Sequence, residues 1–267
     1  MRRYLNFYLT AMKIGLLTQI QYRAQNYFYM IGMMAEPVIY LVVWSTIART
    51  QGGSVGGYTP GAIAAYYIVW TLVRNMNIVF TPYGWEERLQ HGQLSGELLR
   101  PIHPLHNDVA VFAGWKFVVI LLWLPLAAAL ALIFKPSLNP TWLQAAVFFV
   151  AIWGAYLIRT MLLSLLGMIC FWTTRVGAIY ELYFALELVL SGRLVPMTFM
   201  PGWVQRLADF LPFQWTFFFP IHALVGQPSP SELLTGLGIQ VLWILVGIGF
   251  VNLVWHFAVR HFASVGN

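Results

Sequence analysis

The sequence predicts an all-α integral membrane protein with six transmembrane helices, and three features carry that prediction. Hydrophobic residues make up 60% of the chain and charged residues 9%, whereas charged residues are about 25% of an ordinary soluble domain. The apolar segments are continuous and about 20 residues long, which suits membrane-spanning helices rather than the ~10-residue alternating strands of a barrel. The 12 tryptophans and 13 tyrosines suit a protein with two water–lipid interfaces.

Residues 1–25 are expected to form an amphipathic helix that lies in the membrane interface. Apolar side chains recur there at spacings of three and four, which places on one helical face Leu5, Leu9, Met12, Leu16 and Ile20. Beside this face lie cations that would contact anionic lipid headgroups, namely Arg2, Arg3, Lys13 and Arg23. Lys13 and Arg23 also interrupt any apolar core, so we do not expect a signal peptide.

Six apolar segments are predicted to span the membrane, and they are residues 27–47, 62–80, 109–134, 143–171, 176–190 and 233–259. Pro37 lies near the middle of the first segment and implies a kink, because proline lacks an amide N–H and its ring clashes with the preceding turn. The second segment ends in polar residues that begin at Arg74, and the fifth is short and carries Glu181 and Glu187.

The segment 191–220 is apolar and aromatic, but prolines divide it into pieces that are too short to span a membrane. A broken backbone is tolerated at membrane depth only where it packs against protein. We therefore expect a re-entrant pair of short helices that enters the outer leaflet before the last span. A structured external loop is the alternative.

A polar loop, residues 84–108, follows the second predicted span. The chain has 15 basic and 9 acidic residues, and six of these 24 lie in this loop. A loop so charged must contact the aqueous phase or another protein. Nine basic residues fall on the side of the loop and both termini and four on the other side. The positive-inside rule therefore places the termini and the loop in the cytoplasm.

Three motifs in register with the six spans resemble the type-2 ATP-binding-cassette (ABC) exporter permeases, and in particular a prokaryotic branch of that family. The first is Gly92-x-Leu94-x-x-x-Leu98-Leu99-Arg100-Pro101, after the second span. The second is Ser191-Gly192-x-x-x-Pro196, followed by Pro201, Leu211-Pro212-Phe213 and Pro220. The third is the terminal Arg260-x-x-x-Ser264-Val265-Gly266. The resemblance covers the whole chain in order, so residues 1–267 would form a single transmembrane permease domain.

The resemblance implies a function and partners. Such permeases pair as homodimers or heterodimers in the prokaryotic inner membrane and export a substrate. The aromatic and apolar residues expected to line the path suggest that this substrate is amphipathic or lipophilic. Each permease binds a cytoplasmic ATPase subunit, and ATP and Mg²⁺ are bound there rather than on the permease. A coupling helix in the loop after the second span contacts the ATPase, and on this sequence the contact residues would be Trp85, Glu86, Arg88, Leu89, Leu94, Leu98 and Arg100.

Ionisable residues within the predicted spans are expected to face protein or a wet cavity, because each costs about 2.5–3.5 kcal/mol at a helix centre by insertion scales. A translocation path or gate would use Glu36, Arg74, Glu181, Glu187, Pro196, Pro212 and Phe213. The alternative is that the charged residues, with Arg159, form ion pairs that only hold the helices together. Exchanging Glu36 for glutamine would distinguish the two interpretations.

Several kinds of chemistry are not expected. No lysine follows a glycine, which excludes a GxxxxGK phosphate-binding loop, so the chain is not the ATPase. We find no catalytic set and expect no enzyme activity, no metal site at His103 and His106, and no nucleic acid partner despite the net charge of +6. Cys170 is expected to be a small buried apolar residue. The alternative function is an ion-coupled transporter or channel that acts without ATP.

Overall fold

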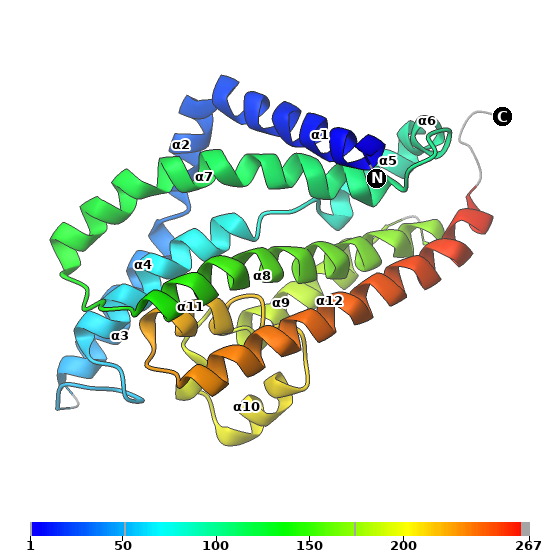
Figure 1. Ribbon diagram of the computed structural model, residues 1–267. Coiled ribbons are helices and arrows are strands. Elements are labelled where there is room, and N and C mark those ends of the chain that lie inside the picture. The colour runs from blue at the N-terminus through cyan, green and yellow to red at the C-terminus, as the bar shows by residue number, and fades with distance from the viewer. Residues whose placement is uncertain (1, 51, 174, 263–267) are drawn as a thin grey trace.

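The computed structural model describes residues 2–50, 52–173 and 175–262, and these form helices and connecting turns with no strand (Figure 1). Four helical stretches have the length and composition to cross a membrane: Arg23–Thr50, Pro104–Phe134, Trp142–Phe171 and Pro230–His261. They correspond to the first, third, fourth and sixth predicted spans. The all-α membrane class is therefore confirmed. Ser264, Val265 and Gly266 of the terminal motif lie outside the described residues.

The other two predicted spans are shorter helices. Helix α4 (Pro60–Met76) has 17 residues and α9 (Gly177–Leu190) has 14, which at 1.5 Å per residue gives about 25 and 21 Å. A hydrocarbon core is about 30 Å thick. Helix α4 is buried along almost its whole length, between α3 (Ala35–Thr50), α7 (Pro104–Phe134) and α11 (Phe218–Val225). The count of six spans stays a prediction.

The predicted kink in the first span is confirmed. Helix α2 (Arg23–Gly32) ends and α3 begins on either side of Met33 and Met34. Met33 is four residues before Pro37, so its carbonyl is the one that the proline ring displaces and deprives of an N–H donor. Arg74 of α4 replaces that donor, since its Nη1 lies 3.0 Å from the Met33 carbonyl oxygen. The carbonyl left without a donor at the break is thus bound by a side chain of the neighbouring helix.

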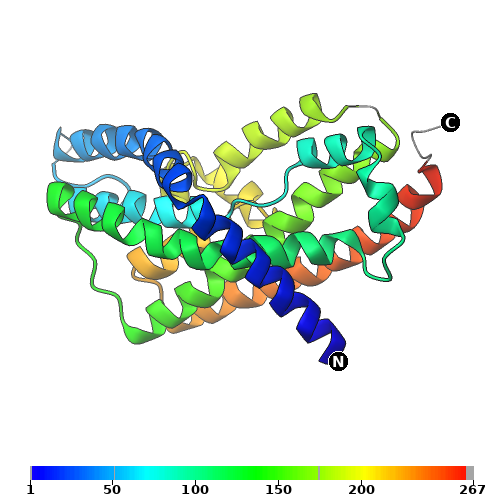
Figure 2. The same ribbon diagram turned by 90° about the horizontal axis from the view of Figure 1, so that it is seen from above.

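The N-terminal helix α1 (Arg2–Gln21) crosses α7 (Figure 2). The crossing is close, because a Cβ at Gly15 would lie 2.1 Å from the Val111 carbonyl oxygen and one at Gly114 would lie 2.0 Å from the Met12 carbonyl oxygen. The face against α7 is therefore built on small residues. Leu5, Leu9 and Ile20 of the predicted apolar face are exposed, while Met12 and Leu16 are half-buried. The outward face remains available to lipid.

The centre of the bundle is α8 (Trp142–Met168), which packs along α12 (Pro230–Ala258). Both begin with a capping box, at Thr141 with Gln144 and at Ser229 with Glu232, so side chains satisfy the first free N–H groups. Short 3₁₀ turns extend them, η1 (Ile169–Phe171) from α8 and η3 (Val259–His261) from α12.

Residues 191–220 fold into short pieces that pack against the bundle, namely η2 (Met197–Phe199), α10 (Gly202–Asp209) and the start of α11. Three side chains of α4 donate hydrogen bonds to backbone carbonyl oxygens of this segment. Tyr66 donates to Gly192 at 2.7 Å, Tyr67 to Leu194 at 3.1 Å and Trp70 to Arg193 at 3.1 Å. These bonds supply the partners that a broken backbone requires within a membrane. The depth of this segment in the bilayer stays a prediction.

The two described ends of the chain and the polar loop lie at the same end of the molecule (Figure 1). The loop between α3 and α4, the turn between α7 and α8, and the start of α12 lie at the other end.

Candidate functional site

The polar loop folds into two short helices joined by a turn. Helix α5 (Pro82–Gln90) begins with a proline in its first turn, and the Thr81 hydroxyl accepts a hydrogen bond from the Gly84 N–H at 3.3 Å. Helix α6 (Gln93–Leu98) follows Gly92, whose φ of 68° is in the left-handed region that favours glycine. Residues within and next to the loop therefore determine where its two helices begin.

Two fully buried side chains hold this loop on the rest of the molecule. Trp85 and Leu94 are both 0% exposed and pack with residues near the ends of α8 and α12. The Trp85 ring fits against Gly167 of α8, where a Cβ would lie 2.2 Å from its Cδ1 atom. The ring of Trp255, from α12, has its centroid 6.2 Å from that of Trp85.

Arg88 joins three helices through its guanidinium group. Its two terminal nitrogens donate to the two carboxylate oxygens of Asp108, at the start of α7, at 2.9 and 3.1 Å. Its Nη1 lies 3.3 Å from Glu97 of α6, and its Cζ lies 4.2 Å from the centroid of the Phe80 ring. A paired arginine–carboxylate contact fixes orientation as well as distance, so α5, α6 and α7 are joined as one unit.

A further bond joins the loop to α9. The Glu86 Oε2 atom accepts a hydrogen bond from the backbone N–H of Val176 at 3.1 Å. Val176 immediately precedes α9 and is buried. A carboxylate at a helix N-terminus is favoured because the free N–H groups there carry partial positive charge.

The two histidines at the end of the loop have separate roles. The Nδ1 atom of His103 accepts a hydrogen bond from the Leu105 N–H at 3.1 Å, and its ring centroid lies 4.1 Å from that of Trp255. Burial lowers the pKa of His103 from 6.5 to about 4, with a smaller contribution from His106. His106 lies against Tyr8 of α1, with Nδ1 2.5 Å from the hydroxyl oxygen.

A chain of five charged side chains, three buried and two half-buried, joins several helices of the bundle. Glu36 of α3 lies 2.9 Å from Arg74 of α4 and 3.5 Å from Arg193. Arg193 also lies 3.9 Å from Glu187 of α9. Both carboxylate oxygens of Glu187 accept from Arg159 of α8 at 2.8 Å. These contacts connect four helices with the segment that follows α9.

One more cation is enclosed near this chain. Lys116 of α7 is 0% exposed, and its amine donates to the Ile78 carbonyl oxygen and lies 4.9 Å from the centroid of the Tyr156 ring. A buried ammonium is costly unless polar or aromatic groups replace water. Lys116 therefore fixes α7 to the non-helical residues after α4.

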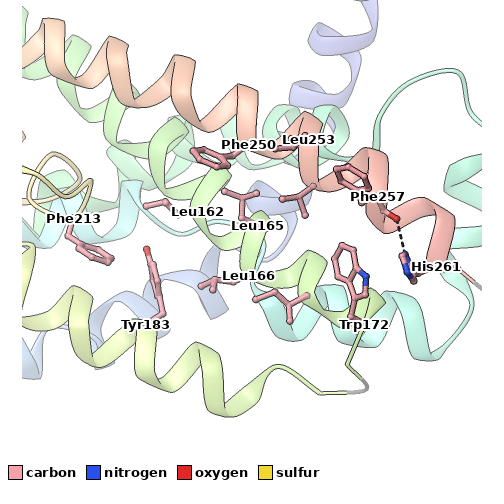
Figure 3. A pocket seen from close by; sticks show the side chains of 12 residues that line it. Leu162, Leu165, Leu166, Trp172, Tyr183, Phe213, Phe250, Leu253, Phe257 and His261 are labelled. Carbon is pink, nitrogen blue, oxygen red and sulfur yellow. Dashed lines mark hydrogen bonds between the residues drawn. The ribbon is translucent and has the colours of Figure 1, made fainter.

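An apolar groove of about 790 Å³ lies between α8, α9 and α12 (Figure 3). Tyr183 and Phe213 lie at one end of it, and Trp172 and His261 lie at the other. Between them the walls are leucine and phenylalanine side chains of α8 and α12, including Leu162, Leu165, Leu166, Phe250, Leu253 and Phe257.

Comparison with known families decides the membership of this chain. Residues 34–266 match the family described as ABC-2 family transporter protein, which covers most of the chain. The protein belongs to the ABC-2 family. It is thus a multi-pass membrane permease component of an ABC transporter and not the ATPase. No curated protein matches the sequence.

The ABC-2 permease does not present all seven predicted ATPase-contact residues at its surface. Trp85, Arg88 and Leu94 are buried, so in this structure they position the loop instead of facing outward. Glu86, Leu89 and Leu98 are half-buried, and Arg100 is exposed. Leu99, which the contact prediction omitted, is 88% exposed. The signal was in the sequence, because Leu94 and Leu98 are four residues apart on one face and Leu99 is turned about 100° from it.

Of the residues predicted for the path or gate of the permease, the structure brings some together and leaves others apart. Glu36, Arg74 and Glu187 are brought together, whereas Glu181 is exposed and accepts a hydrogen bond from Tyr83 at 3.1 Å. Pro196 and Pro212 are buried, and Phe213 packs against Tyr183 with ring centroids 5.5 Å apart. Arg193 also belongs to this charge chain. It is one of the four basic residues that the sequence placed on the side opposite the polar loop, and the sequence did not predict its partners.

Proposed function

We propose that this ABC-2 permease is the membrane subunit of an ATP-driven exporter in a prokaryotic inner membrane. Its termini and polar loop would be cytoplasmic, which the excess of basic residues on that side supports. A separate ATPase subunit would bind ATP and Mg²⁺ and would bind the permease at the polar loop.

The single observation that carries this proposal is the construction of the polar loop. Its inner face is bound to α7, α8, α9 and α12 through Arg88, Trp85 and Glu86. Its outer face carries a leucine that is 88% exposed, followed by the exposed Arg100. An exposed apolar side chain beside a cation suits an amphipathic helix that inserts into a partner's groove, with the charge setting orientation. A displacement at Leu99 would therefore move several helices together.

The substrate path would be completed by a second permease copy or a related chain. Glu36 supports a path beside α3 and α4, because its side chain is 29% exposed and lies on α3 beside Arg74 of α4. The ion-coupled alternative would need Glu36 or Glu187 as ion carriers, whereas both are paired with arginine. We propose an amphipathic or lipophilic substrate, and the apolar segment 191–220 would close the external end.

The test is a tagged pull-down from the native membrane in mild detergent, assayed for vanadate-sensitive ATP hydrolysis. We expect the wild type to recover an ATPase and Leu99→Asp or Arg100→Glu to lose most of it. Removing a side chain at the centre of an interface costs about 2 kcal/mol of binding free energy, which weakens binding roughly 30-fold. Leu138→Asp, in the exposed turn at the opposite end, is the matched control and should recover the wild-type amount.

Normal ATPase recovery by Leu99→Asp and Arg100→Glu, with unchanged melting temperatures, would remove the coupling assignment. A wild-type preparation without any ATPase, over a range of mild detergents, would favour the ion-coupled alternative. A second permease band would identify a heterodimer.

A further inference from the structure

We infer that the apolar groove between α8, α9 and α12 binds an anionic phospholipid, with the headgroup at the end formed by Trp172 and His261. The headgroup end of this site lies at the opposite end of the groove from Tyr183, whose hydroxyl donates to Glu187 of the charge chain. The site is independent of the proposed coupling mechanism.

The body of the groove has the chemistry and length of an acyl-chain site. Its volume is about 790 Å³, and its walls are apolar side chains of α8, α9 and α12. Along α12 and η3 it extends from Phe250 to His261, which at 1.5 Å per residue is about 17 Å. That distance is about half of a 30 Å hydrocarbon core. One acyl chain could therefore run from headgroup level to the middle of the bilayer.

One end of the groove has the chemistry of a headgroup site. Trp172 is 46% exposed and its ring centroid lies 5.4 Å from that of His261, and tryptophan is enriched at headgroup level. Arg175 follows Trp172 by three residues, and Arg260 precedes His261. Both arginines are exposed, and in the described part of the chain neither forms an ion pair with a carboxylate.

The charge at this end decides the class of lipid. Arg260 contacts His256, with Nη2 2.6 Å from Nε2, and that contact supplies no negative charge. The carboxylate of Glu86 accepts a hydrogen bond from the N–H of Val176, the residue after Arg175, and in the described part of the chain it forms no ion pair with Arg175. Basic residues between transmembrane helices at the cytoplasmic side attract anionic headgroups. A cationic aromatic end joined to an apolar body therefore matches an anionic lipid better than a zwitterionic one.

Native mass spectrometry of the purified full-length chain tests this inference. Dioleoyl phosphatidylglycerol and dioleoyl phosphatidylcholine are titrated separately, because they share acyl chains and differ in headgroup charge. We expect the wild type to bind the anionic lipid at a lipid concentration about tenfold lower than it needs for the zwitterionic lipid. The variant Arg175→Gln/Arg260→Gln should lose that preference. Leu253→Trp, which fills the groove, should weaken binding of both lipids.

Two control variants keep the result interpretable. Arg49→Gln/Arg206→Gln removes two other exposed arginines and should keep the wild-type preference. Arg175→Lys/Arg260→Lys keeps both positive charges and should also keep the preference for the anionic lipid. This result would separate loss of charge from loss of folding. Equal binding of both lipids by the wild type, or an unchanged preference in the glutamine variant, would overturn the inference. So would a Leu253→Trp variant whose oligomeric state changes while its lipid binding does not, because a second copy would then fill the groove.

Discussion

At the scale of single residues, the central feature is the pairing of Glu187 with Arg159. Glu187 is 0% exposed and Arg159 is 10% exposed, so neither can regain water if its partner is lost. The hydroxyl of Tyr183 donates to Glu187 at 3.1 Å and completes its surroundings. Replacing a buried pair by apolar groups is often tolerated, but leaving one charge alone costs about 3–5 kcal/mol.

We therefore expect Glu187→Ala to destabilise the permease by about 3–5 kcal/mol, because Arg159 would remain charged and unpaired. The double variant Arg159→Met/Glu187→Met should recover most of that loss. Chemical unfolding in detergent measures both. Glu181→Gln, at an exposed site on the same helix, is the control and should stay within about 0.5 kcal/mol of the wild type. If Glu187→Ala is as stable as that control, the buried pair does not hold α8 and α9 together.

At the scale of elements, the polar loop depends on an uncharged histidine. The ring of His103 packs against Trp255, and burial lowers its pKa to about 4. When the loop opens, the pKa of His103 returns to 6.5, so between pH 6.5 and about 4 the open state binds a proton that the closed state does not. The closed loop is therefore destabilised as the pH falls through this window.

Between pH 7 and pH 5 we expect the free energy of opening to fall by about 2 kcal/mol, since one pKa unit corresponds to about 1.36 kcal/mol. Hydrogen exchange of residues 82–98, corrected for the intrinsic effect of pH, reports that opening. His103→Asn keeps a side-chain acceptor for the helix N-terminus and removes the titration, so its protection should be nearly independent of pH. An equal pH dependence in both proteins would assign the effect to another group.

At the scale of the whole molecule, the arrangement of the two ends makes a prediction about topology. Helix α6, which Leu99 directly follows, lies at the end where α1 begins, and the turn between α7 and α8, which contains Leu138, lies at the opposite end. In a background with Cys170→Ala, a membrane-impermeant maleimide should label Leu99→Cys only from the cytoplasmic side and Leu138→Cys only from outside. Labelling of both from one side would contradict the proposed orientation.

The sequence indicated where short segments belong but not which faces they present. It located the polar loop and its anchors, yet Trp85 and Leu94 face inward and Leu99 faces outward. The direction of a short helix depends on what it packs against, here Gly167 and Trp255. Likewise Arg193 and Lys116 could be recognised as charges in apolar surroundings, but their partners lie far away in the chain.

By itself, the sequence determined the class of this protein, the four long spans, the kink at Pro37 and the resemblance to its family. These features depend on composition, on the length of apolar runs and on local backbone chemistry, all of which are properties of neighbouring residues. Only the tertiary structure decided that Arg74 satisfies the Met33 carbonyl, that five charges form one chain, and that a groove opens between α8, α9 and α12. Each of these depends on contacts between residues distant in the sequence, and no local pattern encodes such contacts.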